Sequence, residues 1–419
     1  MNNSSVLDPS ARVPFKQDAS VIGLVGIAHM VSHFSKLLLA QLFPWLKTEF
    51  NVSYAQLGFL MTVFFVVSCA VQAASGFLVD KVGPRPVLFA GLALIGMAAF
   101  GYALSTSYWM LAGAAVVGGI GNGIFHPVDY TLLNRKVSAP RLGHAYSVHG
   151  ITGSLGWALA PALLVPLALA FSWRVALMAA GALAFVVLSI VVLMRDKLAL
   201  PVIVSKKDAA APAGEDHSLA FLKIPAVWMC FTFFFWYAAV LSVIQTFAPE
   251  AARQLHDVPL PLVAMCLTVY MLASASGMVL GGFLAADASR CERIVGIGFG
   301  IAATTALLLA LGSYPAWLVP VLFGTMGFAS GMAGPSRDLL VKRSTPDNAS
   351  GRVYGVVYAG LDIGQAVTPL LFGLLMDHGH YRSVLFGLVL LQGVLVASAF
   401  KVRSVRRTAA TSNASAMAA

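Results

Sequence analysis

Two histidines and a lysine recur at helical spacing inside an otherwise apolar stretch near the start of the chain. His29, His33 and Lys36 are four and three residues apart, which places all three on one face of an α-helix. Imidazole exchanges protons near neutral pH because its unperturbed pKa is about 6.5, and an ammonium group binds anions. We expect His33 and Lys36 to bind a substrate, His33 to carry protons, and His29 either to assist proton transfer or to hydrogen-bond between helices.

The same spacing also suits a metal ion, because histidines are common metal ligands. A third histidine, cysteine or carboxylate is not evident on that face of the helix. The four cysteines show neither metal-ligand nor disulfide spacing; they are Cys69, Cys230, Cys266 and Cys291. We therefore favour proton and substrate binding over a metal site, and we expect no cofactor.

Charged residues also occur within apolar stretches of the second half of the chain. Low-dielectric surroundings favour the neutral form of a carboxyl group, so Asp362 is a candidate proton carrier or, alternatively, a structural partner for another helix. Arg337 and Asp338 are adjacent and diverge by about 100° on a helix. Arg337 is expected to bind substrate, to pair with Asp129 as a gate, or to extend toward water, and Asp338 is a further candidate proton carrier.

Six further side chains are weaker candidates for a binding pocket. They offer imidazole, amide or aromatic groups within apolar stretches, and they are Asn122, His126, His149, Trp236, Tyr237 and Gln245. Such groups can hydrogen-bond a solute or form an aromatic wall. Ordinary packing between helices is the alternative interpretation for each of them.

The elements that carry these residues are long and apolar. Of the 419 residues, 59% are hydrophobic and 11% are charged, whereas a soluble domain has about 25% charged residues. Apolar stretches of about twenty residues, enough to cross a hydrocarbon layer of about 30 Å, recur along the chain. The scattered basic residues do not form a nucleic-acid-binding surface. We predict an all-α membrane protein.

Polar breaks divide the chain into two groups of six spans. We predict helices near residues 21–43, 54–79, 86–105, 108–130, 144–166, 172–194, 226–249, 261–285, 293–312, 315–340, 352–375 and 382–401. The predicted organisation is a cytosolic tail over 1–20, a six-helix bundle over 21–194, a cytosolic linker over 195–225, a second six-helix bundle over 226–401 and a cytosolic tail over 402–419.

The distribution of basic residues predicts the orientation of these spans. If the N-terminus is cytosolic, the loops on the opposite side contain only Lys47, Arg174, Arg253 and Arg382, and nearly all other lysines and arginines lie inside. This asymmetry satisfies the positive-inside rule and places both termini in the cytosol. We expect a multi-pass protein of the inner (cytoplasmic) membrane of the cell. The asymmetry also accounts for the net charge of +10, which suits anionic lipid headgroups.

The two halves of the chain repeat each other in sequence. Residues 208 positions apart are identical at several places: Gly123 and Gly331, Pro127 and Pro335, Arg135 and Arg343, Gly156 and Gly364, Pro161 and Pro369, and Arg174 and Arg382. Earlier in each half the offset is 206, as for Thr62 and Thr268. Parallel six-helix repeats are associated with a binding site at mid-membrane and with alternating access.

The first inner loop carries a motif with a family resemblance. Its sequence, Gly-Phe-Leu-Val-Asp-Lys-Val-Gly-Pro-Arg-Pro at residues 76–86, resembles the signature loop between helices 2 and 3 of the major facilitator superfamily. The resemblance implies that Asp80 and Arg85 make inner-side contacts that hold the outward-open state. With Asp129, Arg135 and Arg337, they are the predicted conformational gate.

Two shorter motifs refine this resemblance. Gly156 to Pro161 is a partial version of the family's antiporter motif, and with Gly364 and Pro369 it is expected to serve helix packing. The pattern around His29 and His33, together with Phe-His-Pro at residues 125–127, is similar to fosmidomycin-resistance-type exporters. His33 stands where those exporters have an aspartate, and Val128 replaces a glutamate, with Asp129 one position on.

Together these features predict a monomeric secondary transporter whose partners are a small solute, protons and the lipid bilayer. The resemblance favours proton-coupled export of a small, anionic compound or drug, whereas the basic residues suit proton-coupled uptake of an organic anion equally well. The chain contains no Walker-type nucleotide-binding loop. No local catalytic motif is present, so an enzyme is not expected.

Overall fold

The computed structural model describes residues 14–200, 225–285, 290–344 and 350–398, which are helical apart from short turns and loops. The first half contains α1 (Phe15–Ser35), η1 (Ala40–Leu42), α2 (Phe43–Phe50), α3 (Tyr54–Val82), α4 (Pro84–Ala103), α5 (Tyr108–Gly123), α6 (Phe125–Lys136), η2 (Ala139–Arg141), α7 (Leu142–Ala170), α8 (Trp173–Leu193) and η3 (Arg195–Leu198). The second contains α9 (Pro225–Thr246), α10 (Ala248–His256), α11 (Leu260–Leu284), α12 (Cys291–Leu311), α13 (Leu318–Ser344) and α14 (Ser350–Asp377). A final helix covers Tyr381–Ser398.

The helices match the predicted membrane-spanning architecture. Within the described residues, eleven helical segments are long and apolar enough to cross a bilayer, and α5 and α6 together count as one of them. The bent pair formed by α1 with the η1 and α2 segment brings the number to twelve. Two predicted spans are interrupted. The first was expected to be continuous over 21–43 but breaks after Ser35, and the span expected over 108–130 is divided between α5 and α6.

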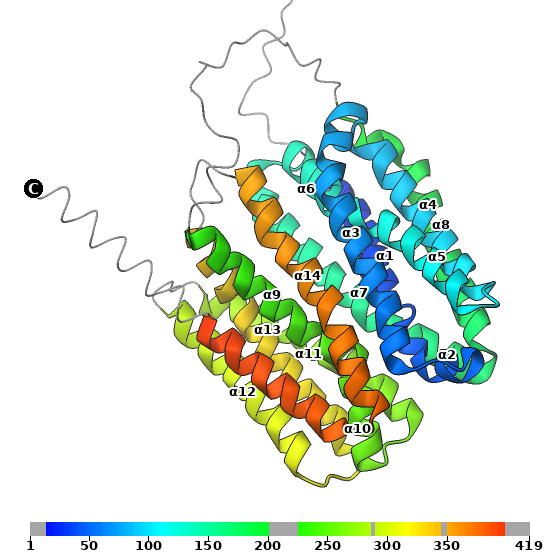
Figure 1. Cartoon of the computed structure of the whole chain (residues 1–419). Helices are drawn as coiled ribbons and strands as arrows, with labels where there is room; N and C mark the ends of the chain where they lie inside the picture. Colours follow the sequence, from blue (N-terminus) through cyan, green and yellow to red (C-terminus); the bar gives the residue numbers. More distant parts are fainter. Residues whose placement is uncertain (1–13, 201–224, 286–289, 345–349, 399–419) are drawn as a thin grey trace, which may run out of the picture.

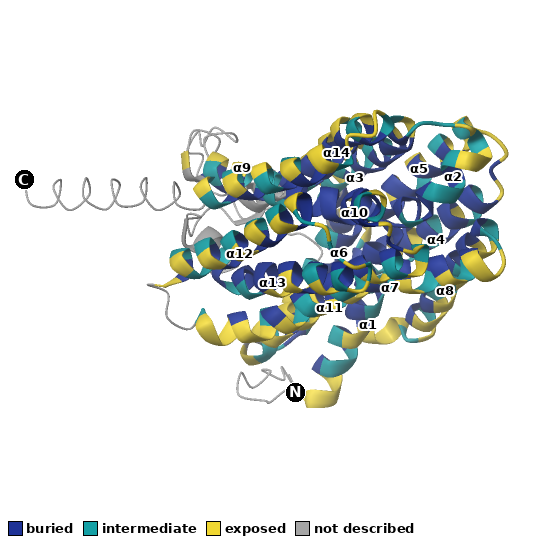
Figure 2. Cartoon of the chain, turned by 90° about the horizontal axis from the view of Figure 1, so that it is seen from below, coloured by how far each residue is buried: buried dark blue, intermediate teal, exposed yellow. Residues whose placement is uncertain are grey.

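The outward faces of the bundle are apolar. In Figure 2 the exposed parts of the helices point outward and the buried parts point toward the interior. Large apolar side chains remain exposed along these faces, including Trp109, Leu193, Phe283 and Leu390. An apolar surface of this extent is unfavourable in water and is expected where lipid surrounds a protein.

Two halves pack against each other along two seams. Figure 1 shows α1 to α8 forming one bundle and α9 to α14 with the last helix forming the other, and α3 packs against α14 while α7 packs against α11. In the first seam Thr62 Oγ1 donates to the carbonyl oxygen of Ala366 at 2.5 Å, and in the second Thr268 Oγ1 donates to that of Ala158 at 3.3 Å. These bonds are equivalent under the sequence repeat, because 268 − 62 = 206 and 366 − 158 = 208.

Glycines at repeated positions allow helices to approach closely within each half. A side-chain carbon added at Gly123 would collide with the carbonyl oxygen of Ser68, and one at Gly331 would collide with that of Ser274. The two glycines are 208 residues apart and the two serines 206. The repeat in the sequence is therefore a repeat of specific contacts, α5 on α3 and α13 on α11.

Gly156→Ala is expected to destabilise the first half. An added Cβ at Gly156 would collide with the carbonyl oxygen of Met30 in α1, and backbone cannot yield without separating α7 from α1. Overpacking of this kind costs about 1–3 kcal/mol, which should appear as a lower Tm of the purified protein. Gly150→Ala on the same helix meets no atom within 4 Å and is the matched control. Equal Tm values for the two variants would contradict this account of α1 on α7.

The halves are latched at the end of the bundle where α2 and α10 lie, which we call the α2–α10 end. The opposite end, where α1 and α9 begin, is the linker end. At the α2–α10 end the two carboxylate oxygens of Asp377, the last residue of α14, accept hydrogen bonds from the backbone N–H groups of Tyr54 and Ala55 at 2.7 and 2.8 Å. Lys47 Nζ lies 3.6 Å from the same carboxylate.

The latch is formed at the N-terminus of α3. The first N–H groups of a helix lack partners within it, and the helix dipole favours an anion there. Ser53 and Gln56 form a capping box at the start of α3, and Asp377 supplies the remaining acceptors from the other half of the protein. The contact therefore stabilises closure of the α2–α10 end.

Asp377→Ala is expected to open the α2–α10 end. Loss of hydrogen bonds to a charged group costs about 1.5–3 kcal/mol, which shifts the equilibrium between conformations by on the order of 10–100-fold. The readout is the rate at which a membrane-impermeant maleimide labels Thr246→Cys, a buried position in the cavity at that end, in a background without the native cysteines. Glu49→Ala is the control, because Glu49 pairs with Arg174 inside the first half. Unchanged labelling in Asp377→Ala would argue against the latch.

Candidate functional site

Lys36 lies at the break in the first span. α1 ends at Ser35, and the next residues form tight turns before η1. The Lys36 side chain is buried, and the carbonyl end of α1 carries a partial negative charge that favours a cation there. Interrupted membrane helices of this kind often form solute sites in transporters. The break was not predicted, and the role of Lys36 in substrate binding stays a prediction.

Asp362 faces the first half from the middle of α14. Its side chain is buried, and its Oδ2 accepts a hydrogen bond from Gln72 Nε2 of α3 at 3.2 Å. Lys36 and Asp362 attract each other electrostatically. The repeat places Ser154 opposite Asp362 in sequence, 208 residues earlier, so this charge lies in only one of the two seams. A charge attraction therefore links the two halves at mid-depth.

Asp129 is the centre of a histidine cluster in the first half. Its Oδ2 accepts hydrogen bonds from His29 Nδ1 at 2.9 Å and from His149 Nε2 at 3.1 Å, and all three side chains are buried. The rings of His29 and His149 stack with their centroids 3.5 Å apart. In this structure α6 turns the Asp129 carboxylate toward α1 and α7, and its pairing with Arg337 as a gate stays a prediction.

His33 and Trp157 extend this cluster. The His33 ring lies 4.3 Å from those of both His29 and Trp157, centroid to centroid. Neither ring nitrogen of His33 has a hydrogen-bond partner among the described residues. A Cβ at Gly153 would come within 2.9 Å of the His33 ring, so this glycine provides the space that the ring occupies. Trp157 was not predicted as a site residue.

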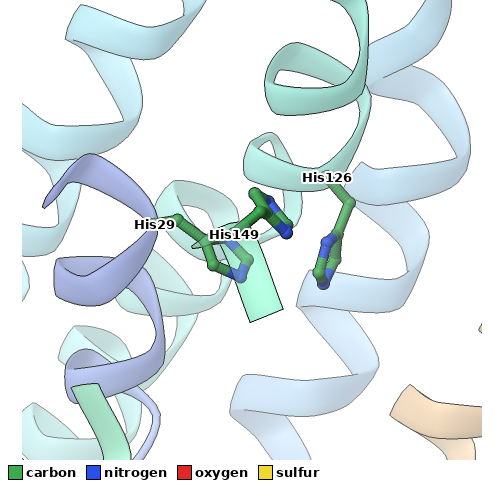
Figure 3. A group of neighbouring side chains, drawn as sticks. All are labelled: His29, His126 and His149. Carbon is green, nitrogen blue, oxygen red and sulfur yellow. The ribbon is translucent and has the colours of Figure 1, made fainter. Parts of the chain in front are cut away.

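His126 completes the group from α6. One nitrogen from each of His29, His126 and His149 lies within 4.8 Å of the others, and Figure 3 shows the three rings gathered between the helices that carry them. The face of the first helix offers no third metal ligand in the sequence. The additional histidines come from two other helices, α6 and α7.

A helix break positions His126. α5 ends at Gly123 and α6 begins at Phe125. Pro127 has no N–H to give to the Gly123 carbonyl four residues earlier. The Ser75 hydroxyl lies 3.4 Å from that carbonyl oxygen and also reaches the carbonyl oxygen of Gln72, at 3.1 Å. The proline therefore accounts for the change of direction that begins just before His126.

Arg337 of α13 lies over aromatic rings of α9. Its guanidinium carbon is 4.3 Å from the centroid of the Tyr237 ring and 5.9 Å from that of Phe234. Arginine stacks favourably on aromatic faces. Arg337 and Tyr237 are thus brought together as candidate binding residues, while the side chain of Asp338 lies outside the described residues.

Three other predicted residues have different surroundings. Asn122 accepts a hydrogen bond from Ser32 and donates one to Ser68, both at 2.8 Å. It therefore joins three helices, and its role in substrate binding stays a prediction. Gln245 is buried beside a cavity of about 40 Å³ at the α2–α10 end, and its side-chain amide has no partner among the described residues. Trp236 is half-buried and packs edge-on against Phe235.

The predicted gate at the linker end is described only in part. Gly83 ends α3 with φ of 85°, a conformation that favours glycine and that reverses the chain into α4. Arg85 is half-buried near the start of α4 and Arg135 is exposed near the end of α6. The side chain of Asp80 lies outside the described residues, so its contact with Arg85 stays a prediction.

Sequence comparisons agree with the fold. A model of the Major Facilitator Superfamily matches residues 25–356 and, in a second match, 242–416. The fosmidomycin resistance protein of Escherichia coli is 27% identical over 151 residues, which cover only 34% of this chain and 35% of that protein. A probable sulfoacetate transporter of Cupriavidus necator is 21% identical over 378 residues, which cover 85% and 87%.

A solved structure shares the whole architecture. A bacterial homologue of the human lysosomal transporter Spinster, in an inward-facing and occupied conformation, superposes with a TM-score of 0.74 and covers 94% of this chain and 98% of that one. At 15% sequence identity this likeness concerns the fold alone.

Proposed function

This chain belongs to the major facilitator superfamily, and as a member it is a secondary transporter; we propose that it moves a small organic anion together with protons. The observation that carries the proposal is that a buried cation and a buried carboxylate belong to opposite halves of the protein. Lys36 lies at a helix break in the first half and Asp362 in α14 of the second, and their opposite charges attract each other. A site shared by both halves is the arrangement that alternating access requires.

The anion binds to cations that the two halves of the protein contribute. Lys36 supplies an ammonium from the first half, and Arg337 with Tyr237 supplies a guanidinium and a ring from the second. Both cations offer charge-assisted hydrogen bonds to carboxylate, sulfonate or phosphonate groups. The name of the Cupriavidus relative, a probable sulfoacetate transporter, agrees with an anionic solute.

Protonation of Asp362 couples the proton to the anion. When Asp362 is ionised, it attracts Lys36 and competes with the solute for the ammonium group. When it is protonated, the attraction ends and Lys36 is free to bind the anion. Proton and anion therefore bind together, so the direction of net movement under an inward proton gradient is uptake.

Export in exchange for protons is the second candidate. The similarity to the fosmidomycin resistance protein favours it, as does the partial antiporter motif at Gly156 to Pro161. Antiport requires that proton and solute exclude each other. In that case the solute would displace a proton from the charged groups around Lys36 rather than bind beside it.

The orientation of the protein in the membrane follows from the distribution of its basic residues. The linker end carries basic side chains such as Lys136 and Arg195, which the positive-inside rule places on the cytosolic side. We propose that this end faces the cytosol of a bacterial cell and that the α2–α10 end faces outward. The latch at Asp377 would then close the outer side.

Accumulation in proteoliposomes tests the proposal. Carboxylates, sulfonates and phosphonates are first screened for ligands that raise the Tm of the purified protein, since binding to the folded state stabilises it. Symport predicts that a radiolabelled hit accumulates when the outside is acidic; antiport predicts accumulation when the inside is acidic. Hits that bind but never cross the membrane would contradict both and would identify a sensor instead.

A further inference from the structure

We propose that His29, His126 and His149 bind a first-row transition-metal ion of the Zn²⁺ type. The three imidazoles come from α1, α6 and α7, all in the first half. They lie together without help from the second half, so the site goes beyond the proposed transport function and does not rest on it.

The nitrogens lie near the spacing of a three-histidine site, and the stacked rings of His29 and His149 must tilt apart for their lone pairs to converge on one ion. One ring nitrogen from each histidine lies within 4.8 Å of the other two. Zn–N bonds of about 2.0–2.1 Å in a tetrahedral site place ligand nitrogens about 3.3 Å apart. His126 is half-buried, and a rotation of its side chain toward His29 and His149 would have to close the remaining distance.

Asp129 prepares two of the ligands. His29 uses Nδ1 and His149 uses Nε2 to reach the same carboxylate oxygen. When each neutral ring donates its N–H to this oxygen, Nε2 of His29 and Nδ1 of His149 retain lone pairs for a metal. Metal-binding histidines in proteins typically have such a carboxylate or carbonyl partner, which fixes the tautomer and the ring orientation.

The charges around the site select the kind of metal. Asp129 contributes a buried negative charge, and its Oδ1 has no hydrogen-bond partner among the described residues. Lys36 acts in the opposite sense, because it repels positive charge at His126 and His33. A cation held mainly by electrostatics, such as Na⁺ or Mg²⁺, gains little here. Ions with strong bonds to imidazole, such as Zn²⁺, Ni²⁺, Cu²⁺ and Co²⁺, suit the site.

Metal titration of the full-length protein tests the proposal. The protein is purified in detergent without a histidine tag, and Co²⁺ is added as a spectroscopic probe, followed by Zn²⁺ in calorimetry. We expect one ion per chain, with the intense visible absorption of tetrahedral Co²⁺, displaced by Zn²⁺. His126→Ala is expected to weaken binding by at least about 100-fold, and Asp129→Asn by about 10–100-fold.

Three comparisons keep the test decisive. His126→Asn replaces His126→Ala if the latter does not yield a monodisperse protein. The double variant His378→Ala and His380→Ala removes a stacked surface pair and is expected to leave the Co²⁺ spectrum unchanged. Lys36→Gln should tighten Zn²⁺ binding several-fold by removing a repulsive charge.

Two results would overturn the metal site. One is a wild-type protein that shows no tetrahedral Co²⁺ absorption. The other is binding that survives both His126 variants, or that disappears only with the His378 and His380 pair. These readouts use no solute, so a protein that transports anions and ignores metal would fail this inference alone, and a protein that binds metal without transporting would fail only the proposed function.

Discussion

Asp362→Asn is expected to abolish accumulation of the anion driven by a pH gradient. Asparagine keeps the size of the side chain and can still accept the hydrogen bond from Gln72, but it does not titrate and no longer attracts Lys36. Lys36 is then permanently available to the anion. Exchange of labelled for unlabelled anion across the membrane should therefore continue, while accumulation falls to the level of liposomes without protein.

Two assays on the same proteoliposomes separate exchange from coupled transport. Counterflow measures the exchange of labelled for unlabelled anion, and a pH gradient drives accumulation. Asp196→Asn, which changes an exposed aspartate in η3 at the linker end, is the control and should behave as wild type. If Asp362→Asn still concentrates the anion under a pH gradient, the proton is carried elsewhere. If it also loses counterflow, Asp362 is needed for binding or folding rather than for coupling.

Lys36→Met is expected to remove most of the affinity for the anion. Methionine keeps an unbranched, apolar side chain of similar length in the buried position, so the loss reports on the charge. A hydrogen bond to a charged group contributes about 1.5–3 kcal/mol, which corresponds to a Kd on the order of 10–100-fold weaker. The measurement is the concentration dependence of the ligand-induced rise in Tm.

A second lysine provides the matched comparison. Lys136 donates to the carbonyl oxygen of Ala199 at 2.8 Å near the linker end, away from the proposed site, and Lys136→Met should leave the Kd of the anion unchanged. A Kd for Lys36→Met within twofold of wild type would exclude Lys36 as the anion's partner.

The repeated architecture could be predicted from the sequence because it depends on local signals. Span length follows from hydropathy, and the offsets of 208 and 206 follow from glycines, prolines and threonines that are identical in both halves. The structure confirms the repeat through equivalent contacts, such as Thr62 with Ala366 and Thr268 with Ala158. Such helices can be predicted from the sequence because the position of each depends on residues within that helix or on its repeat in the other half.

The histidine cluster could not be predicted in the same way because it depends on how helices face one another. Asp129 follows the position where similar exporters have a glutamate. One residue turns a helical side chain by about 100°, so the sequence gave no reason to expect Asp129 to act like that glutamate. The break before Phe125 and the rotation of α6 bring Asp129 to His29 and His149. The only sequence signal was the occurrence of histidines 126 and 149 at similar predicted depth.

The break after Ser35 was missed for a related reason. Residues 36–39 read Lys-Leu-Leu-Leu, which continues the apolar pattern, and neither glycine nor proline marks the turn. Pro44 lies further on, within the first turn of α2. The end of α1 is stabilised by tertiary packing, so hydropathy alone extends the helix through it.

Simultaneous measurement of anion and proton movement tests the account most directly. Proteoliposomes are loaded with a pH-sensitive dye, and a labelled anion identified by the Tm screen is added outside at equal pH. The account predicts that the lumen acidifies as the anion enters, in fixed proportion to it, and that Asp362→Asn admits the anion without acidification. Entry of the anion into wild-type vesicles with no change in luminal pH, or with alkalinisation, would contradict it.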